Sequence, residues 1–218
     1  MTNPTLKPYQ SAPGTISADR MDLLLISNLV PPQIRVLDIG CGEGDLLALL
    51  KAQKQIDGRG LEISQRNVNT CVARGLSVVQ GDGDRDLGQY PDKGFDYAIL
   101  SQTLQAMQKP EDVLVQLSRI SHKLVVSIPN FGHWRVRLNL LRSGRMPRTK
   151  TLDSEWYNTP NIHLCTLLDF NELCAHLNLT IEHCILMRNG STRNLTRAPN
   201  GLDNLLTEQA IYTLSTHS

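Results

Sequence analysis

The chain has 218 residues, a size that allows one well-packed core and leaves little room for two domains. Hydrophobic residues make up 40% and charged residues 20%, and the formal net charge of +1 excludes a strong overall attraction to nucleic acid or to an anionic membrane. The apolar runs are too short to span a bilayer, the polar N-terminus lacks a signal-peptide pattern, and the five scattered cysteines show no zinc spacing. We therefore expect a cytoplasmic protein that has no metal, no membrane partner and no nucleic-acid partner.

Strand and helix signals alternate regularly in the first part of the chain. Residues 1–16 form a loose lead-in, and a helix is expected over 18–29, where Ser17 provides an N-cap and Pro31-Pro32 a stop. Five short apolar strands then alternate with helices, which predicts a parallel sheet covered by helices on both faces. The strands are expected at 35–39, 58–63, 76–80, 95–101 and 124–128, and the helices at 46–53, from Ser64 to Gly75 and from Pro110 onward.

The rhythm changes after Pro129. Thr166 and Asp169 resemble a capping box, with Asp in place of the usual Glu or Gln, and predict a helix through Leu177. We expect one domain over residues 1–187 and a peripheral C-terminal tail over 188–218. The other expected elements are a helix over 132–141, a polar and aromatic insertion over 144–160, a last strand over 180–187 and a terminal helix near 203–214.

The first strand leads into a glycine-rich turn, Asp38-Ile39-Gly40-Cys41-Gly42-Glu43-Gly44, at the start of a helix. Glycines let the backbone turn tightly and approach a ligand closely. Dinucleotide-binding proteins use the spacing Gly-x-Gly-x-x-Gly and place a pyrophosphate at the helix end. Here the third glycine comes one residue early and Glu43 lies inside the turn, and both features disfavour a pyrophosphate. Asp38 instead suits a cationic amino group, which S-adenosylmethionine (SAM) carries in its methionine part.

Two further acids follow the next two strands. Glu62 ends the second strand, where a carboxylate can accept hydrogen bonds from both hydroxyls of a ribose. Gly81-Asp82 follows the third strand, where a carboxylate could accept from the exocyclic amine of adenine. Taken alone, Asp38 can be read as a helix-capping residue and Asp82 as an ordinary turn residue. Together the three acids mark the carboxyl ends of successive strands, where open α/β sheets bind ligands.

This order of glycine loop and acids resembles the class I SAM-dependent methyltransferases over about residues 17–187. The resemblance implies a Rossmann-like α/β fold with a seven-stranded, mostly parallel sheet whose last strand is antiparallel. It also implies that Gly40 and Gly42 contact the methionine part, Glu62 the ribose and Asp82 the adenine, and that the segment 101–105 flanks the sulfonium. The cofactor-binding residues expected for SAM are Asp38, Gly40, Cys41, Gly42, Glu62, Ile63, Asp82, Gly83 and Ser101.

Four longer blocks resemble the MetW family. These blocks are SQTLQA at 101–106, PNFGHWRVRL at 129–138, GRMP at 144–147 and WYNTPNIHLCT at 156–166. The family is tied to methionine biosynthesis and is commonly encoded next to a homoserine O-acyltransferase. The resemblance therefore implies an accessory or activating role with that acyltransferase as partner, and it implies no methyl acceptor.

Candidate catalytic residues are few. The acidic-proline-proline-aromatic signature of amino-group methyltransferases is absent after the fourth strand. His133, Tyr157 and His163 are the candidate bases, although plain hydrogen bonding or surface packing explains them more simply. The arginine-rich segment over 135–150, bracketed by aromatic residues, is equally readable as a docking surface for an acidic partner or anionic substrate and as a solvated helix face.

Two functions are therefore consistent with the sequence. The first is a SAM-binding partner of homoserine O-acyltransferase, which would let methionine biosynthesis sense its own downstream product. The alternative is a SAM-dependent methyltransferase acting on an unidentified small molecule or protein. A nicotinamide-dependent oxidoreductase is a third reading, and the glycine spacing argues against it.

Overall fold

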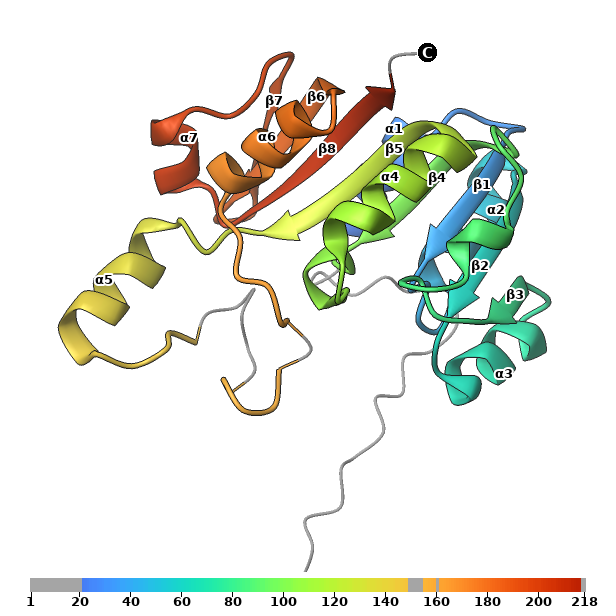
Figure 1. The fold of residues 1–218 in the computed structure, drawn as a ribbon, viewed down its shortest axis with the longest axis horizontal. Coiled ribbons are helices and arrows are strands. Elements are labelled where there is room, and N and C mark those ends of the chain that lie inside the picture. Colours follow the sequence, from blue (N-terminus) through green and yellow to red (C-terminus); the bar gives the residue numbers. More distant parts are fainter. Residues whose placement is uncertain (1–20, 149–154, 160, 217–218) are drawn as a thin grey trace, which may run out of the picture.

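The computed structural model describes residues 21–148, 155–159 and 161–216, which form an open α/β sheet with helices on both faces (Figure 1). The sheet has eight strands in the order β3-β2-β1-β4-β5-β8-β6-β7. The strands are β1 (Arg35–Ile39), β2 (Asp57–Glu62), β3 (Ser77–Gln80), β4 (Phe95–Ser101), β5 (Ser121–Pro129), β6 (Leu179–Arg188), β7 (Ser191–Leu195) and β8 (Gln209–Thr216).

Seven α-helices and two short 3₁₀ turns connect the strands in the described residues. The predicted helix of 18–29 is described only from residue 21, and its expected cap, Ser17, lies outside the described residues. The helices are α1 (Met21–Leu29), α2 (Asp45–Lys54), α3 (Gln65–Ala73), α4 (Pro110–Ile120), α5 (Trp134–Ser143), α6 (Leu167–His176) and α7 (Gly201–Leu206), and the turns are η2 (Leu87–Gln89) and η3 (Leu104–Ala106).

Two hydrophobic clusters hold the helices on opposite faces of the sheet. On one face, α4 and α6 pack through residues such as Leu114 and Phe170, and Figure 1 shows these two helices in front of the strands. On the other face, α1, α2 and α3 pack through residues such as Ile26, Leu47 and Cys71. The predicted covering of a largely parallel sheet on both faces is therefore confirmed.

Strands β1 to β5 are parallel, as the alternation of elements predicts. Strand β8 is antiparallel to both β5 and β6, and β7 is paired to the outer edge of β6 as a hairpin. The sheet thus has eight strands rather than the expected seven. The extra strand is β7, which follows an Asn189-Gly190 turn with both residues at positive φ, 47° and 76°, the backbone geometry that suits two-residue hairpins.

The expectation of a peripheral tail over 188–218 is wrong for most of that segment. Strand β8 lies between β5 and β6, and Ala210, Ile211, Tyr212 and Leu214 are fully buried. The helix expected near 203–214 is limited to α7, over 201–206. The reason is that β8 pairs with residues that are distant along the chain, from Met187 with Gln209 to Lys123 with Ser215, and such long-range pairing outweighs a weak local preference.

The caps predicted at two helices are present. Thr166 and Asp169 form a reciprocal capping box at α6, with the Asp169 N–H donating to Thr166 Oγ1 at 3.2 Å and the Thr166 N–H donating to Asp169 Oδ2 at 2.8 Å. Ser64 Oγ accepts from the Asn67 N–H at the start of α3. Each cap satisfies donors that a helix start leaves unpaired, and the Ser64 cap fixes the chain directly after Glu62.

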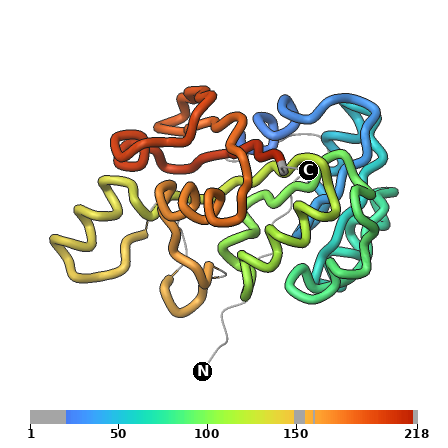
Figure 2. Tube along the Cα trace, turned by 45° about the horizontal axis from the view of Figure 1, so that its top comes forward, coloured from blue at the N-terminus to red at the C-terminus, as the bar shows by residue number. Residues whose placement is uncertain are grey.

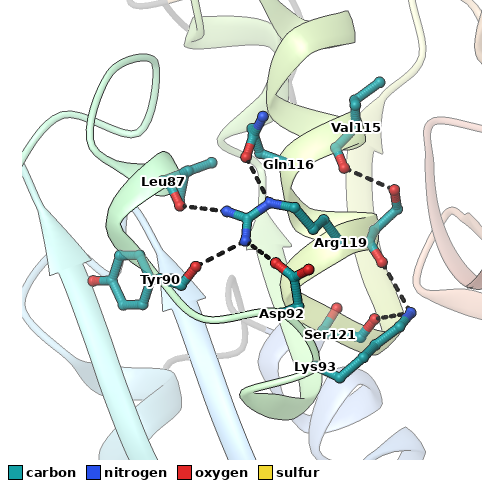
Figure 3. Close-up of polar contacts among 9 residues, drawn as sticks. Leu87, Tyr90, Asp92, Lys93, Val115, Gln116, Arg119 and Ser121 are labelled. Atoms are coloured by element: carbon teal, nitrogen blue, oxygen red, sulfur yellow. Dashed lines mark hydrogen bonds and ion pairs between the residues drawn. The ribbon is translucent and has the colours of Figure 1, made fainter.

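Arg119, near the end of α4, fastens the connection between β3 and β4 (Figure 3). Its guanidinium donates to the carbonyl oxygens of Leu87 at 3.1 Å and Tyr90 at 2.9 Å and also pairs with Asp92. Lys93 Nζ donates to the carbonyl oxygens of Ser118 and Ser121 beside it. These bonds satisfy backbone groups of a long loop, so we read the cluster as structural rather than as a ligand site.

Helix α5 extends away from the sheet, as Figures 1 and 2 show from two directions. Within α5, Val136 is the one residue whose side chain is buried. Among the described residues, the structure has no helix that is both long and apolar enough to cross a membrane.

Candidate functional site

The carboxyl ends of β1, β2, β3 and β4 meet at one edge of the sheet. In register, Ile39 of β1 pairs with Leu61 of β2, and Glu62 pairs with Gln80 of β3. Strand β1 also pairs with β4, so Ser101 follows at the same edge. The structure therefore brings the nine expected cofactor-binding residues to the end of the sheet where ligands of α/β proteins bind.

The glycine loop between β1 and α2 uses three left-handed glycines, Gly40, Gly42 and Gly44, with φ of 68°, 56° and 82°. A Cβ on Gly40 would overlap Thr103 Cγ2, so this glycine is needed for close approach of the segment after β4. A Cβ on Gly42 would meet no atom within 4 Å. Gly42 therefore borders open space at the edge of the sheet.

The N–H groups of the loop are already engaged within the protein. Gly40 N donates to Leu61 O at 2.7 Å, and Gly44 N donates to Cys41 O at 3.0 Å. Gly42 N donates to Glu62 Oε2 at 2.9 Å. A phosphate bound at a glycine loop relies on such N–H groups, and three of them here point to protein oxygens.

Glu62 holds the loop in place. Besides Gly42 N, its carboxylate accepts from Ser64 N at 2.9 Å and from Asn67 Nδ2 at 3.3 Å, and the residue is 7% exposed. Two carboxylate oxygens offer about four acceptor positions in total, so three are used and about one remains for a ligand. Ile63, directly after it, is 66% exposed beside this carboxylate.

Asp82 and Gly83 lie in the turn after β3. Gly81 N donates to Glu62 O at 3.0 Å, which joins this turn to the end of β2. Asp82 Oδ1 accepts from Asp84 N at 2.9 Å, and its other oxygen lies 3.4 Å from Arg85 Nε. Asp82 thus stabilises its own turn, as its alternative interpretation as a turn residue suggested, while its carboxylate stays partly exposed at the site.

The segment after β4 lies next to the glycine loop at the carboxyl ends of the strands, where Thr103 is close to Gly40. Gln102 has a positive φ of 54°, which is uncommon for a residue other than glycine. Its N–H donates to Ser127 Oγ at 2.9 Å, and its side chain donates to Asp22 Oδ2 of α1 at 2.9 Å. Ser101 Oγ is buried and has no hydrogen-bond partner in the described part of the chain.

Four residues besides the nine expected ones shape this edge, and two of them, Gln102 and Thr103, lie in the segment 101–105 that the resemblance expects beside the sulfonium. Asn67 and Thr103 contact Glu62 and the loop, and Gln102 and Asp22 join the segment after β4 to α1. Asn67 follows a capping serine at the expected spacing, so its position near Glu62 could have been inferred from the helix start. Asp22 meets Gln102 across 80 residues of the chain, a long-range contact that has no local signal.

The loop region carries negative charge. Asp38 is 1% exposed, and Glu62 is the second buried acid beside the loop. Burial raises the pKa of the Cys41 thiol, and the charges of Asp38 and Glu62 raise it further. Both causes disfavour a negative charge in the loop, and the two carboxylates beside it would also repel a bound anion.

The three candidate bases do not share one environment. His133 is 4% exposed at the N-cap position of α5, and burial lowers the pKa of its imidazole. Tyr157 is 72% exposed and packs edge-on to Trp156, and His163 is exposed. One candidate is thus buried and two lie on the surface, so the structure does not gather them into one enclosed catalytic site. No metal-binding cluster of His, Cys, Asp or Glu occurs in the residues that the structure describes.

The chain is similar to a known protein family and to a curated protein. Residues 20–214 match the model of the family described as methionine biosynthesis protein MetW. The chain is 32% identical over 177 residues to the bifunctional methionine biosynthesis protein MetXA/MetW of Rhodopirellula baltica. That match covers 77% of this chain and 28% of the relative, so the chain spans about a quarter of the relative's length.

Solved structures confirm the Rossmann-like methyltransferase fold. A SAM-dependent methyltransferase from Thermotoga maritima superposes with a TM-score of 0.65 and 17% identity, covering 92% of this chain and 91% of that one. The [4+2]-cyclase SpnF superposes with a TM-score of 0.64 and 19% identity, covering 92% and 82%. Because one of these two carries the name of a cyclase, the fold alone does not assign methyl transfer. The match to the family model over nearly the whole chain is more specific: the chain belongs to the MetW family of methionine biosynthesis proteins.

Proposed function

We propose that the protein binds SAM at the glycine-loop edge and acts as an accessory, activating partner of homoserine O-acyltransferase. The observation that carries the cofactor proposal is the glycine loop itself, whose N–H groups are bonded within the protein and whose neighbours are two buried acids. Such a loop suits a ligand with a cationic ammonium and sulfonium and does not suit a pyrophosphate.

The residues at this edge fit SAM in a consistent order. In this proposal, Asp38 and the loop from Gly40 to Gly42 contact the methionine part, with Cys41 lining the loop, and Glu62 uses its remaining acceptor position for the ribose. The exposed Ile63 covers a face of the adenine, with Asp82 and Gly83 at its edge. The unpartnered Ser101 Oγ lies in the segment beside the sulfonium.

The acyltransferase proposal rests on the relative from Rhodopirellula baltica. Its name joins MetXA with MetW in one chain, and the part similar to this protein is only 28% of that chain. Fusion of two functions in one chain supports physical association of the separate proteins. Methionine is the precursor of SAM, so a SAM-binding subunit on the acyltransferase would connect the pathway to its downstream product. The five cysteines are free thiols, which fits the cytoplasm as the place of this complex.

An activity assay tests this proposal. Homoserine O-acyltransferase from the same genome is assayed alone, with this protein, and with this protein over a titration of SAM. We expect the protein to raise acyltransferase activity and SAM to change the size of that effect. Unchanged activity at every SAM concentration, together with no complex on gel filtration, would contradict the proposal.

Methyl transfer to a small molecule or a protein is the second candidate. It is favoured by two buried oxygens in the segment after β4, Ser101 Oγ and Gln105 Oε1, which have no hydrogen-bond partner among the described residues and could orient an acceptor. Hydroxyl and amide groups are poor bases, however, so the acceptor would have to be a ready nucleophile. Incubation with methyl-labelled SAM and cell extract would produce a labelled product if this candidate is correct. Binding of SAM with no labelled product would remove it.

A further inference from the structure

Helix α5 turns an apolar stripe to solvent. Trp134, Leu138 and Leu141 follow the spacing i, i+4, i+7, which places them on one side of a helix. Their exposed fractions are 38%, 36% and 83%. Such a stripe is normally buried against another element, so its exposure on a projecting helix marks an interaction surface.

More apolar side chains lie exposed between α5 and α6. Trp156 and Tyr157 are both 72% exposed and stack edge-on with their ring centroids 5.7 Å apart. Ile162 and Leu164 are 55% and 50% exposed. Aromatic residues with this exposure are enriched at the centres of protein interfaces, so the same connection carries a second group of contact residues.

The surroundings of the stripe are basic. Residues 131–148 contain five arginines and no aspartate or glutamate. Arg135 and Arg142 are seven residues apart and flank one side of the stripe, and Arg137 flanks the other. Arg142 and Arg145 have no ion-pair partner in the described part of the chain, so their charges are available to an acidic partner.

This charge also decides against a second copy of the chain. In a symmetric dimer the same surface meets itself, so the arginines of α5 would face the arginines of the other copy. Like charges opposed across an interface cost several kcal/mol. An apolar groove with an acidic rim is the complementary surface, and a helix in a groove is a common mode of recognition.

We infer that α5 is the docking element for the acyltransferase, which receives the Trp134, Leu138 and Leu141 stripe in an acidic-rimmed apolar groove. This inference rests on the proposed function and adds the surface that would carry it. The short segment between β5 and α5 is fixed to the rest of the fold, because Asn130 Nδ2 donates to Asn204 O and Thr207 O at 2.7 Å each. A fixed segment before α5 holds the helix in one orientation, which lowers the entropic cost of binding.

The docking surface is also bonded to the cofactor edge. The N–H groups of Ile162 and His163 both donate to Gln105 O at 3.0 Å, and Gln105 Nε2 donates to Gln102 O at 2.8 Å. Gln102 lies directly between Ser101 and Thr103, next to the glycine loop. A partner that shifts Ile162 and His163 would therefore also shift Gln105 and the segment 101–105 beside the proposed SAM site.

Binding of the full-length protein to the same-genome acyltransferase tests the inference. The variant carries Leu138→Asp and Leu141→Asp, and the matched control is Val72→Asp, an exposed apolar residue (58%) on α3. We expect the double variant to lose at least tenfold in affinity, Arg142→Glu to weaken binding mainly at low salt, and the control to bind within about twofold of the wild type. SAM affinity and thermal melting are measured on every variant to show that the fold is intact.

The possible outcomes separate the docking surface from the proposed function. If the wild-type protein forms a complex and the double variant binds equally tightly, the docking surface is wrong while the proposed function stands. If the wild-type protein forms no complex, the proposed function and the docking surface fall together. If the isolated protein sediments as a dimer that the double variant abolishes, the surface is real and its occupant is a second copy.

Discussion

Gly42→Ala separates the role of the glycine loop in folding from its role in binding. Gly42 has φ of 56°, and an added Cβ would meet no protein atom within 4 Å. The folded protein therefore loses only the cost of placing alanine in the left-handed region, about 1–2 kcal/mol. The N–H of Gly42 is retained in alanine, so its hydrogen bond to Glu62 remains.

The added methyl group lies in the space where the methionine part of SAM is proposed to lie. We expect at least a tenfold loss of SAM affinity, about 1.4 kcal/mol, measured by isothermal titration calorimetry. Gly75→Ala is the matched control, because Gly75 also has a positive φ, 72°, and open space, but follows α3 at the opposite edge of the sheet. Both variants should lower the melting temperature by about 2–8 °C. Equal SAM affinities in the two variants would refute the proposed position of the ligand.

Three further predictions concern the framework around the site. Gly40→Ala should destabilise the protein more than Gly42→Ala by about 1–3 kcal/mol, because its Cβ overlaps Thr103 Cγ2, and Thr103→Ser should restore part of that loss in thermal melts. Asn130→Ala should cost about 2–5 kcal/mol in urea unfolding, because Asn204 O, Thr207 O and Gly132 N all lose a buried partner, and a cost under about 1 kcal/mol would contradict the anchoring role of Asn130. Burial lowers the pKa of His133, so the unfolded chain binds a proton at this imidazole more readily than the folded protein does. The free energy of unfolding should therefore fall as the pH drops below about 6.5. The variant His133→Asn should show a smaller fall between about pH 7.5 and pH 5.5.

The parallel half of the fold could be predicted from the sequence because each element carries its own local signal. Strands β1, β4 and β5 contain short apolar runs, and helices in this half begin at residues such as Ser64 and Pro110 that suit a helix start. Consecutive parallel strands with helical crossovers also have few permitted arrangements. Local pattern and topology therefore agree over this part of the chain.

The antiparallel half was harder for physical reasons. Strand β8 is stabilised by pairing with β5 on one side and β6 on the other, and its run Ala-Ile-Tyr-Thr-Leu over 210–214 is a short strand signal within a polar segment. The Asn, Thr and Ser residues around it resemble a loose tail when the sequence is read without the pairing to β5 and β6. The β6–β7 hairpin, by contrast, had a usable signal in Asn189-Gly190.

At the site, the sequence predicts which residues meet but not what they do to each other. Glu62 was expected to bind ribose, and the structure shows that it also holds Gly42, Ser64 and Asn67. Glu62→Ala would therefore loosen the loop as well as remove a ligand contact, and its effect on SAM affinity would mix the two. Gly42→Ala avoids this confusion because it leaves those hydrogen bonds in place.

Calorimetric titration of the wild-type protein with SAM, its demethylated product and NAD tests the cofactor assignment most directly. We predict binding of SAM and of the demethylated product at one site per chain, with no detectable heat from NAD. Saturable binding of NAD, or no binding of SAM, would contradict the central claim that this glycine loop holds SAM.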